Sequence, residues 1–162
     1  MASIRTQKKR RRQGKTDYKN RLSLLKANKP RIVIRGTNKY FILQAIESVE
    51  AQDRVVKTIT SKDLIKLGWD AKFKGSLKSL PAGYLTGILA SKDLKGPGYI
   101  VDLGMARTTS GNRIFAVLKG LVDGGVKISA NEKVFPSDER VKGQHLKEEV
   151  QQVITKVMEK LK

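Results

Sequence analysis

Residues 31–60 read RIVIRGTNKYFILQAIESVEAQDRVVKTIT and contain three runs rich in β-branched and aromatic residues. Runs of this kind favour strands, which we predict over residues 31–35, 39–47 and 54–60. The Gly-Thr-Asn sequence at residues 36–38 predicts a hairpin turn after the first run, and residues 50–53 predict a turn after the second. Three successive strands with such short connections predict an antiparallel meander.

The pattern changes after residue 60, where helical periods alternate with one further strand. We predict a short helix over 61–68, a loop over 69–79, a helix over 81–94, a strand over 99–103 and a helix from about residue 110 to the two glycines at 124–125. A crossover helix between the meander and the fourth strand predicts a right-handed, parallel connection. The sequence therefore predicts an α/β fold in which helices pack on a mixed sheet, a layout that resembles ribonuclease H-like proteins.

Both ends of the chain lie outside this predicted body. Thr16 and Asp17 predict the start of a short helix, which Asn-Lys-Pro at residues 28–30 ends. Residues 136–139 predict the start of one terminal helix with a single apolar stripe, formed by Leu146, Val150, Val153, Val157 and Leu161. We therefore predict three parts: a basic arm with a short helix (1–30), an α/β body (31–128) and a loop with a C-terminal helix (129–162).

Positive charge is concentrated at the N-terminus. The net charge is +19, and the first 31 residues contain 12 basic residues and only one acid. Repulsion at this density predicts that residues 1–15 are disordered alone and fold on an anionic partner, which is nucleic acid, an anionic membrane or an acidic protein. Membrane binding needs interleaved apolar residues, and Ile4 is the only large one between Met1 and Tyr18. Nucleic acid is therefore the favoured partner. The alternative, a charged segment that only aids solubility, is disfavoured because solubility needs far less charge.

The basic residues of the arm differ in what they can bind. Arg10, Arg11 and Arg12 can each hold a phosphate with two hydrogen bonds and stack on exposed bases, whereas the lysines act as point charges. Because stacking requires unpaired bases, this composition favours folded RNA over uniform duplex DNA.

A second candidate phosphate site is the sequence Arg-Thr-Thr-Ser-Gly-Asn-Arg at residues 107–113, between a predicted strand end and a helix start. Backbone N–H groups at a helix N-terminus, with hydroxyls and two flanking arginines, suit a phosphate. Gly111 would let a backbone approach closely. The alternative is a plain helix cap made by Ser110, which explains neither arginine.

Several classes of chemistry are excluded. The chain has no cysteine and one histidine, His145, so disulfides, thiolate metal sites and multi-histidine metal sites are excluded. The longest stretch without a charged residue, 79–91, has 13 residues, and about 17 are needed to span a bilayer. No secretory signal is present, and we predict no membrane partner. A ribonuclease H-like nuclease needs clustered carboxylates, including one on the first strand, yet that strand has none and Asp102 on the fourth strand lacks an acidic partner. We predict no enzyme, cofactor or metal.

Gly83 and Gly87 predict close packing of their helix on the sheet.

Two motifs resemble a known family. Residues 10–18 (RRRQGKTDY) followed by Arg21 and Leu22, and residues 106–115 (ARTTSGNRIF) continuing to 118–125 (LKGLVDGG), resemble the archaeal-type large-subunit ribosomal protein L-eighteen family. Lesser matches are Arg35 with Asn38 and Lys39, Tyr84 with Gly87, and Phe135 with Pro136. The resemblance covers almost the whole chain, and the archaeal form is favoured because the chain lacks the large C-terminal extension of the eukaryotic relatives.

The resemblance implies a non-enzymatic, cytoplasmic protein of the large ribosomal subunit. The family binds 5S rRNA and attaches it to large-subunit (23S-type) rRNA in the central protuberance, beside ribosomal proteins that include the L-five family. The RNA contacts so implied are Arg5, Lys8, Lys9, Arg10, Arg11, Arg12, Lys15, Thr16, Tyr18, Lys19 and Arg21 in the arm, Arg35, Asn38 and Lys39 at the sheet, and Arg107, Thr108, Thr109, Ser110, Asn112 and Arg113 in the second motif. Gln13 departs from the family pattern, where an acid is expected.

Two other functions stay open at this point. An RNA-processing factor on the same ribonuclease H-like fold would cleave RNA with metal ions. The absence of an acid from the first strand argues against this function. A general basic nucleic-acid-binding protein would bind duplex DNA and RNA equally, and its charge would be spread evenly rather than concentrated in an arm.

Overall fold

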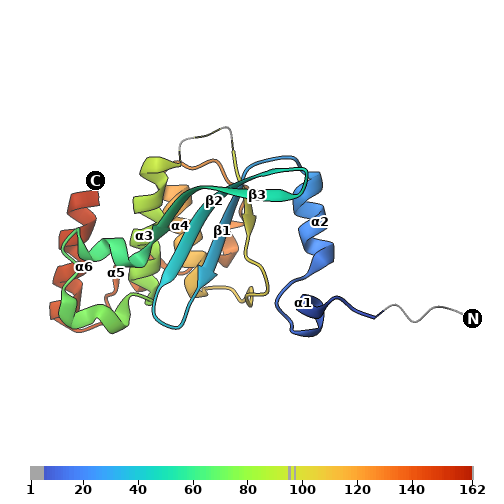
Figure 1. Cartoon of the computed structure of the whole chain (residues 1–162). Helices are drawn as coiled ribbons and strands as arrows, with labels where there is room; N and C mark the ends of the chain where they lie inside the picture. Colours follow the sequence, from blue (N-terminus) through green and yellow to red (C-terminus); the bar gives the residue numbers. More distant parts are fainter. Residues whose placement is uncertain (1–5, 95, 97, 162) are drawn as a thin grey trace, which may run out of the picture.

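A four-stranded mixed sheet forms the centre of the protein (Figure 1). The computed structural model describes residues 6–94, 96 and 98–161, without the side chain of Lys74. The strands are β1 (Arg31–Gly36), β2 (Phe41–Val49), β3 (Gln52–Thr60) and β4 (Ile100–Asp102), in the order β3-β2-β1-β4. β2 pairs antiparallel with β1 and β3, and β4 pairs parallel with β1, so the predicted α/β fold with a meander and a parallel fourth strand is confirmed. The ribonuclease H-like label stays a prediction, as does the division into three parts.

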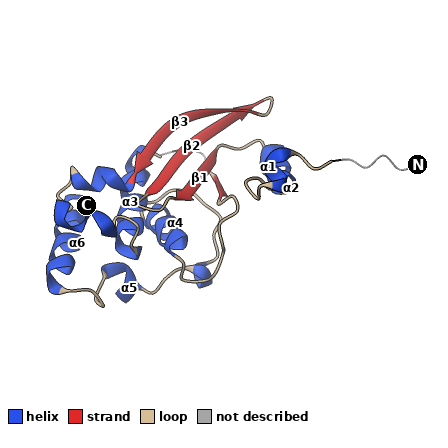
Figure 2. Cartoon of the chain, turned by 60° about the horizontal axis from the view of Figure 1, so that its bottom comes forward, coloured by secondary structure: helices blue, strands red, loops and turns tan. Residues whose placement is uncertain are grey.

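Two helices, α3 (Leu80–Asp93) and α4 (Arg113–Asp123), lie on one face of the sheet (Figure 2). Apolar side chains of β1 and β2, including Ile32, Ile34 and Leu43, form the first core cluster with Val117 and Leu121 of α4. All five are almost completely buried. The β-branched runs that predict the strands therefore also supply the core.

Glycines bring α3 and α4 into direct contact with each other. A Cβ atom on Gly87 would lie 2.3 Å from the carbonyl oxygen of Val117, and one on Gly120 would lie 2.2 Å from that of Tyr84. Only hydrogen fits at either position. Gly87 was predicted to pack closely against the sheet. This prediction is wrong, because the immediate neighbours of Gly87 belong to α4.

A second core cluster lies between α3 and the C-terminal helix α6 (Glu148–Leu161). Ile154, Val157 and Leu161 of α6 are buried against Trp69 and Leu85. Trp69 lies between two 3₁₀ helices, η1 (Ser61–Ile65) and η2 (Ala71–Ser76), where a loop was predicted over 69–79. A third, η3 (Glu132–Val134), precedes the terminal helices.

The single terminal helix predicted from residue 136 onward is wrong. The structure has two helices, α5 (Asp138–Lys142) and α6, separated by Gly143. Gly143 adopts the left-handed conformation with φ of 75°, and its N–H bonds the carbonyl oxygen of Arg140. A left-handed glycine ends a helix, so the chain turns before α6 begins.

The N-terminal segment carries two helices, α1 (Lys9–Arg12) and α2 (Tyr18–Lys26). The carboxylate of Asp17 accepts hydrogen bonds from the backbone N–H groups of Lys19 and Asn20, which confirms the predicted start of α2. The segment predicted to be disordered alone instead contains one helical turn, α1, and its described residues through Lys15 are exposed. Leu22 of α2 is also exposed.

Candidate nucleic-acid interface

An ion-pair network centred on Asp102, the last residue of β4, links this strand to Arg31 at the start of β1 and to Arg35 near its end. Its Oδ2 lies 3.4 Å from Nη1 of Arg31, and its Oδ1 lies 2.9 Å from Nη2 of Arg35 and accepts a hydrogen bond from the N–H of Gly104. Asp102 is nearly buried, and Arg31 is only 1% exposed. The lone acid of the fourth strand therefore serves to orient two arginines.

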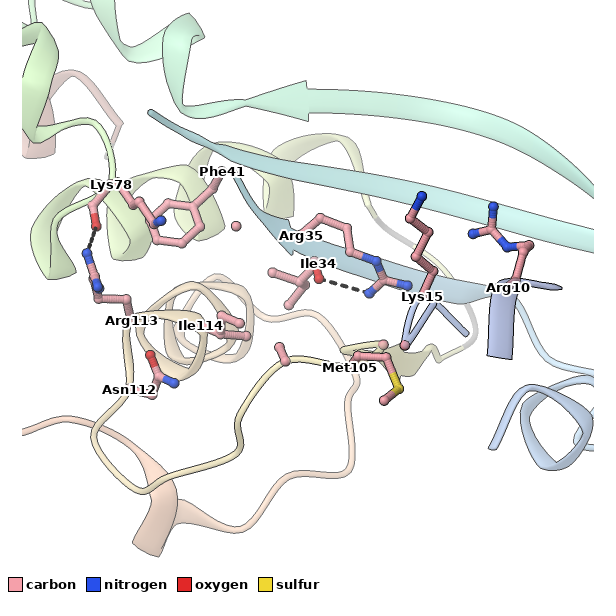
Figure 3. A pocket seen from close by; sticks show the side chains of 14 residues that line it. Arg10, Lys15, Ile34, Arg35, Phe41, Lys78, Met105, Asn112, Arg113 and Ile114 are labelled. Atoms are coloured by element: carbon pink, nitrogen blue, oxygen red, sulfur yellow. Dashed lines mark hydrogen bonds between the residues drawn. The ribbon is translucent and has the colours of Figure 1, made fainter. Parts of the chain in front are cut away.

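A cleft of about 500 Å³ opens beside this network (Figure 3). We call it the cationic cleft; its lining includes Arg10, Lys15, Arg35, Lys78 and Arg113, which come from the arm, from β1, from the segment before α3 and from the start of α4. Among the residues that the structure describes, no aspartate or glutamate lines it. Five cationic side chains around one open cleft create a positive potential that attracts phosphate groups.

Arg35 has a double role at this cleft. Its guanidinium donates hydrogen bonds to the backbone carbonyl of Asp102, at 2.7 Å, and to that of Ile34, in addition to the ion pair. The side chain is still 41% exposed. Arg35, predicted to contact RNA, is thus held rigidly at the cleft wall by protein partners.

The second motif leads into α4 as predicted, and two of its side chains make hydrogen bonds within the protein. The hydroxyl of Ser110 donates to the carbonyl oxygen of Lys133 and does not cap the helix, so the plain-cap alternative is wrong. Gly111 has φ of 72°, and a Cβ atom there would meet nothing within 4 Å. The backbone conformation favours glycine at this position, and the space beside it is open, so the expected close approach stays a prediction. The side-chain amide of Asn112 donates to the carbonyl oxygen of Arg107.

The two arginines of this motif lie in different surroundings. Arg113 lines the cationic cleft, and its Nη1 lies 3.5 Å from the carbonyl oxygen of Lys78. Arg107, Thr108 and Thr109 are exposed and do not line the cleft. The structure thus brings only Arg113 and Asn112 of the motif into the cleft.

The arm contributes two basic residues to the cleft, and others lie elsewhere. Nε of Arg10 donates a hydrogen bond to the hydroxyl of Thr16, which links α1 to the residues before α2. The ammonium group of Lys8 lies 4.7 Å from the ring centre of Tyr18. The remaining basic residues, Lys9, Arg11, Arg12 and Lys19, are exposed and outside the cleft. Arg5 lies outside the described residues.

Arg21, also predicted to contact RNA, forms an ion pair within the protein. Its Nη1 lies 3.0 Å from Oδ2 of Asp53, beside the turn between β2 and β3. Burial raises the pKa of Asp53, but hydrogen bonds from Ser48 and Arg21 and the charges of Arg31 and Arg21 outweigh it, so that the pKa lies below its ordinary value. Arg21 therefore anchors α2 to the sheet.

Lys78 lines the cationic cleft but is not singled out by any pattern in the sequence. It lies in the segment predicted as a loop, where it is one of several lysines without a distinguishing motif. Only the fold brings it to Arg113 across 35 positions of the chain. Asn38 and Lys39 are exposed in the turn between β1 and β2, next to the cleft but outside it.

Within residues 6–94, 96 and 98–161, no group of three or more histidine, cysteine or carboxylate side chains is placed to hold a metal ion. Over the same residues, no helix is both long enough and apolar enough to cross a membrane.

Comparison with known proteins identifies the family. The family of "Ribosomal large subunit proteins 60S L5, and 50S L18" matches residues 3–97 and 95–131 of the chain. The chain belongs to this L5/L18 ribosomal protein family. The matched residues include the basic arm, the sheet and α4, and thus every residue of the cationic cleft.

Individual relatives in the L5/L18 family cover most of the chain. The large ribosomal subunit protein uL18 of Methanospirillum hungatei is 45% identical over 143 residues, which span 86% of this chain and 79% of the relative. The uL18 protein of Korarchaeum cryptofilum is 43% identical over 141 residues, 85% of this chain and 70% of the relative. That of Methanoregula boonei is 40% identical over 85% of this chain and 79% of the relative. These archaeal relatives are ribosomal proteins and not enzymes, which confirms the resemblance and the non-enzymatic prediction.

Proposed function

We propose that this L5/L18 family protein binds 5S rRNA and attaches it to large-subunit rRNA in the central protuberance of the cytoplasmic ribosome. The observation that carries the proposal is the cationic cleft, in which five basic side chains from four separate segments converge with no acid among the lining residues. The shared chemistry of these side chains selects phosphate oxygens.

The rigid part of the site determines where the RNA backbone binds. Asp102 fixes the guanidinium of Arg35, and Arg113 begins α4 with its guanidinium 3.5 Å from the carbonyl oxygen of Lys78. Side chains held in this way bind phosphates at set positions, so the cleft selects an RNA whose backbone has a matching shape.

The arm supplies most of the electrostatic affinity. Its exposed basic residues Lys9, Arg11 and Arg12 lie on the single turn of α1, and none of them is buried. We expect these residues to enter an RNA groove next to the backbone held in the cleft. We expect a further stretch of RNA to contact the exposed residues that precede Asn112 in the chain, which are Arg107, Thr108 and Thr109.

A reconstitution experiment tests the bridging role. We expect 5S rRNA and a fragment of large-subunit rRNA to migrate as one complex in gel filtration only when the protein is added. As the salt concentration is raised, a variant lacking residues 1–15 is expected to lose the joint complex before the full chain does. Separate migration of the two RNAs in the presence of saturating protein would contradict the proposal. A neighbouring L-five family protein can then be added to ask whether it strengthens the joint complex.

A further inference from the structure

A second hollow, distinct from the cationic cleft, lies on the other side of the turn between β1 and β2. Its volume is about 720 Å³, within the roughly 300–1,000 Å³ of small-molecule sites. We call it the turn pocket; it is lined by Asn38, Lys39, Tyr40, Lys62, Ile65 and Leu77, together with Gly75.

The floor of the turn pocket is apolar and its rim is basic. Tyr40, Ile65 and Leu77 belong to the second core cluster, and Leu77 is only 4% exposed. Lys39 and Lys62 are exposed, and no acid lines the pocket. An apolar floor with cations above it fits a flat, uncharged ring that is joined to negative charge.

The ring of Tyr40 is open to such a group. The ammonium of the exposed Lys62 lies 4.2 Å from the centre of this ring, so a lysine side chain covers one face of the ring. A nucleobase can take the place of the ammonium, which then moves to the adjoining phosphate. Exposed Asn38 carries an amide that both donates and accepts hydrogen bonds at the edge of a base.

The turn pocket and the cationic cleft share no lining residue, but neighbouring residues of the same two chain segments line them. Lys78 and Gly36 line the cleft, whereas Leu77 and Asn38, one and two positions away, line the pocket. An RNA strand whose phosphates lie in the cleft therefore passes within reach of the pocket.

We propose that the turn pocket receives one unstacked nucleobase of a bound RNA, stacked on Tyr40, with Lys39 and Lys62 on the flanking phosphates. The proposal rests on the proposed function in taking RNA as the partner, and it adds a base-binding site to backbone recognition. An apolar side chain of a neighbouring protein is the other possible occupant, but it gives no role to the basic rim.

Gly75 allows a clean test. A Cβ atom there meets nothing within 4 Å, and its φ is not positive, so Gly75→Leu fills part of the pocket without strain. Ala71→Leu is the matched control, because it adds the same side chain to the same 3₁₀ helix at an exposed position outside the pocket. Both variants keep the charge of the protein.

The two variants are compared with the wild type for binding to 5S rRNA and to a short single-stranded oligoribonucleotide that carries 2-aminopurine. We expect Gly75→Leu to weaken binding of both RNAs by about tenfold, the range of one base–aromatic stack, with an unchanged salt slope. The wild type and Ala71→Leu are expected to change the fluorescence of 2-aminopurine, and Gly75→Leu is not. Lys62→Gln, compared with Lys72→Gln outside the pocket, is expected to reduce the salt slope by about one.

The outcomes separate this inference from the proposed function. If Gly75→Leu binds both RNAs as tightly as Ala71→Leu does, the turn pocket receives no base and the inference is overturned. If Gly75→Leu weakens the oligoribonucleotide but the wild type does not prefer 5S rRNA, the base site stands and the 5S assignment fails.

Discussion

The guanidinium of Arg31 and the carboxylate of Asp53 form an ion pair of 2.6 Å across the width of β2, and Arg31 is almost completely buried. The same guanidinium faces Asp102, and the second oxygen of Asp53 binds Arg21 of α2. One buried arginine thus connects the first strand, the β2–β3 turn, the fourth strand and, through Asp53, the helix that follows the arm. This network ties α2 to the sheet.

Removing Arg31 should destabilise the fold strongly. Arg31→Met leaves Asp102 almost buried with Arg35 as its remaining cation, and breaking a buried pair costs about 3 kcal/mol. We expect the free energy of unfolding, measured with urea, to fall by about this amount. Arg54→Met, at an exposed position of β3, serves as the control and should change it by less than about 0.5 kcal/mol. Equal stability of the two variants would mean that the network does not hold the fold together.

The contact of α3 with α4 should not tolerate a methyl group. Gly87→Ala places a Cβ atom 2.3 Å from the carbonyl oxygen of Val117, so the helices must move apart, at a cost of about 1–3 kcal/mol. We expect a lower thermal midpoint than in Gly75→Ala, where the added methyl group meets nothing within 4 Å. A midpoint equal to that of the control would show that the helices adjust freely.

Tyr84 should make stability fall at alkaline pH. Burial, together with the hydrogen bond that its hydroxyl donates to Asp123 at 3.0 Å, raises the pKa of Tyr84 from 10.0 to about 12. Because the folded state holds this proton more tightly than the unfolded state, the stabilisation is complete below pH 10 and is lost as pH rises from 10 toward 12.

Ultraviolet absorbance of tyrosinate measures this directly. Among the four tyrosines, one is expected to titrate last, and Tyr84→Phe should remove that final step. The variant should also lose less stability than the wild type between pH 10 and 12. An unchanged last step in Tyr84→Phe would assign the high pKa to another residue.

The two arginines of the second motif should differ in RNA binding. Arg113 lines the cationic cleft beside Lys78, whereas Arg107 is exposed outside it. We expect Arg113→Gln to reduce the preference for 5S rRNA over unrelated RNA by about tenfold, the scale of one charge-assisted contact. Arg107→Gln should weaken both RNAs alike, with a salt slope smaller by about one. The reverse ranking, measured by filter binding, would move the selective site from the cleft to the exposed loop.

The local features of the fold could be predicted from the sequence, and the long-range contacts could not. The β-branched run at 31–35 and the Gly-Thr-Asn turn predict β1 and its hairpin because strand propensity and turn chemistry act over a few residues. Gly143 carried the signal for the break before α6, but the apolar stripe on both sides outweighed it in the prediction.

The candidate site was predictable only in its types of residue. Charge density pointed to the arm, and the helix start pointed to Arg113. That Arg35 binds Asp102 depends on which strands become neighbours. That Arg21 binds Asp53, and that Arg113 meets Lys78, depends on how the helices pack on the rest of the fold. No local pattern distinguishes an arginine that binds RNA from one that binds a distant carboxylate.

The most direct test of the account is the affinity of the protein for 5S rRNA and for a size-matched unrelated folded RNA, measured side by side across a salt series. We predict that a preference of about a hundredfold, close to 3 kcal/mol, persists at high salt because the fixed side chains of the cleft select a backbone shape. Two equal curves that fall together as salt rises would contradict it, because they would mean that charge alone binds the RNA.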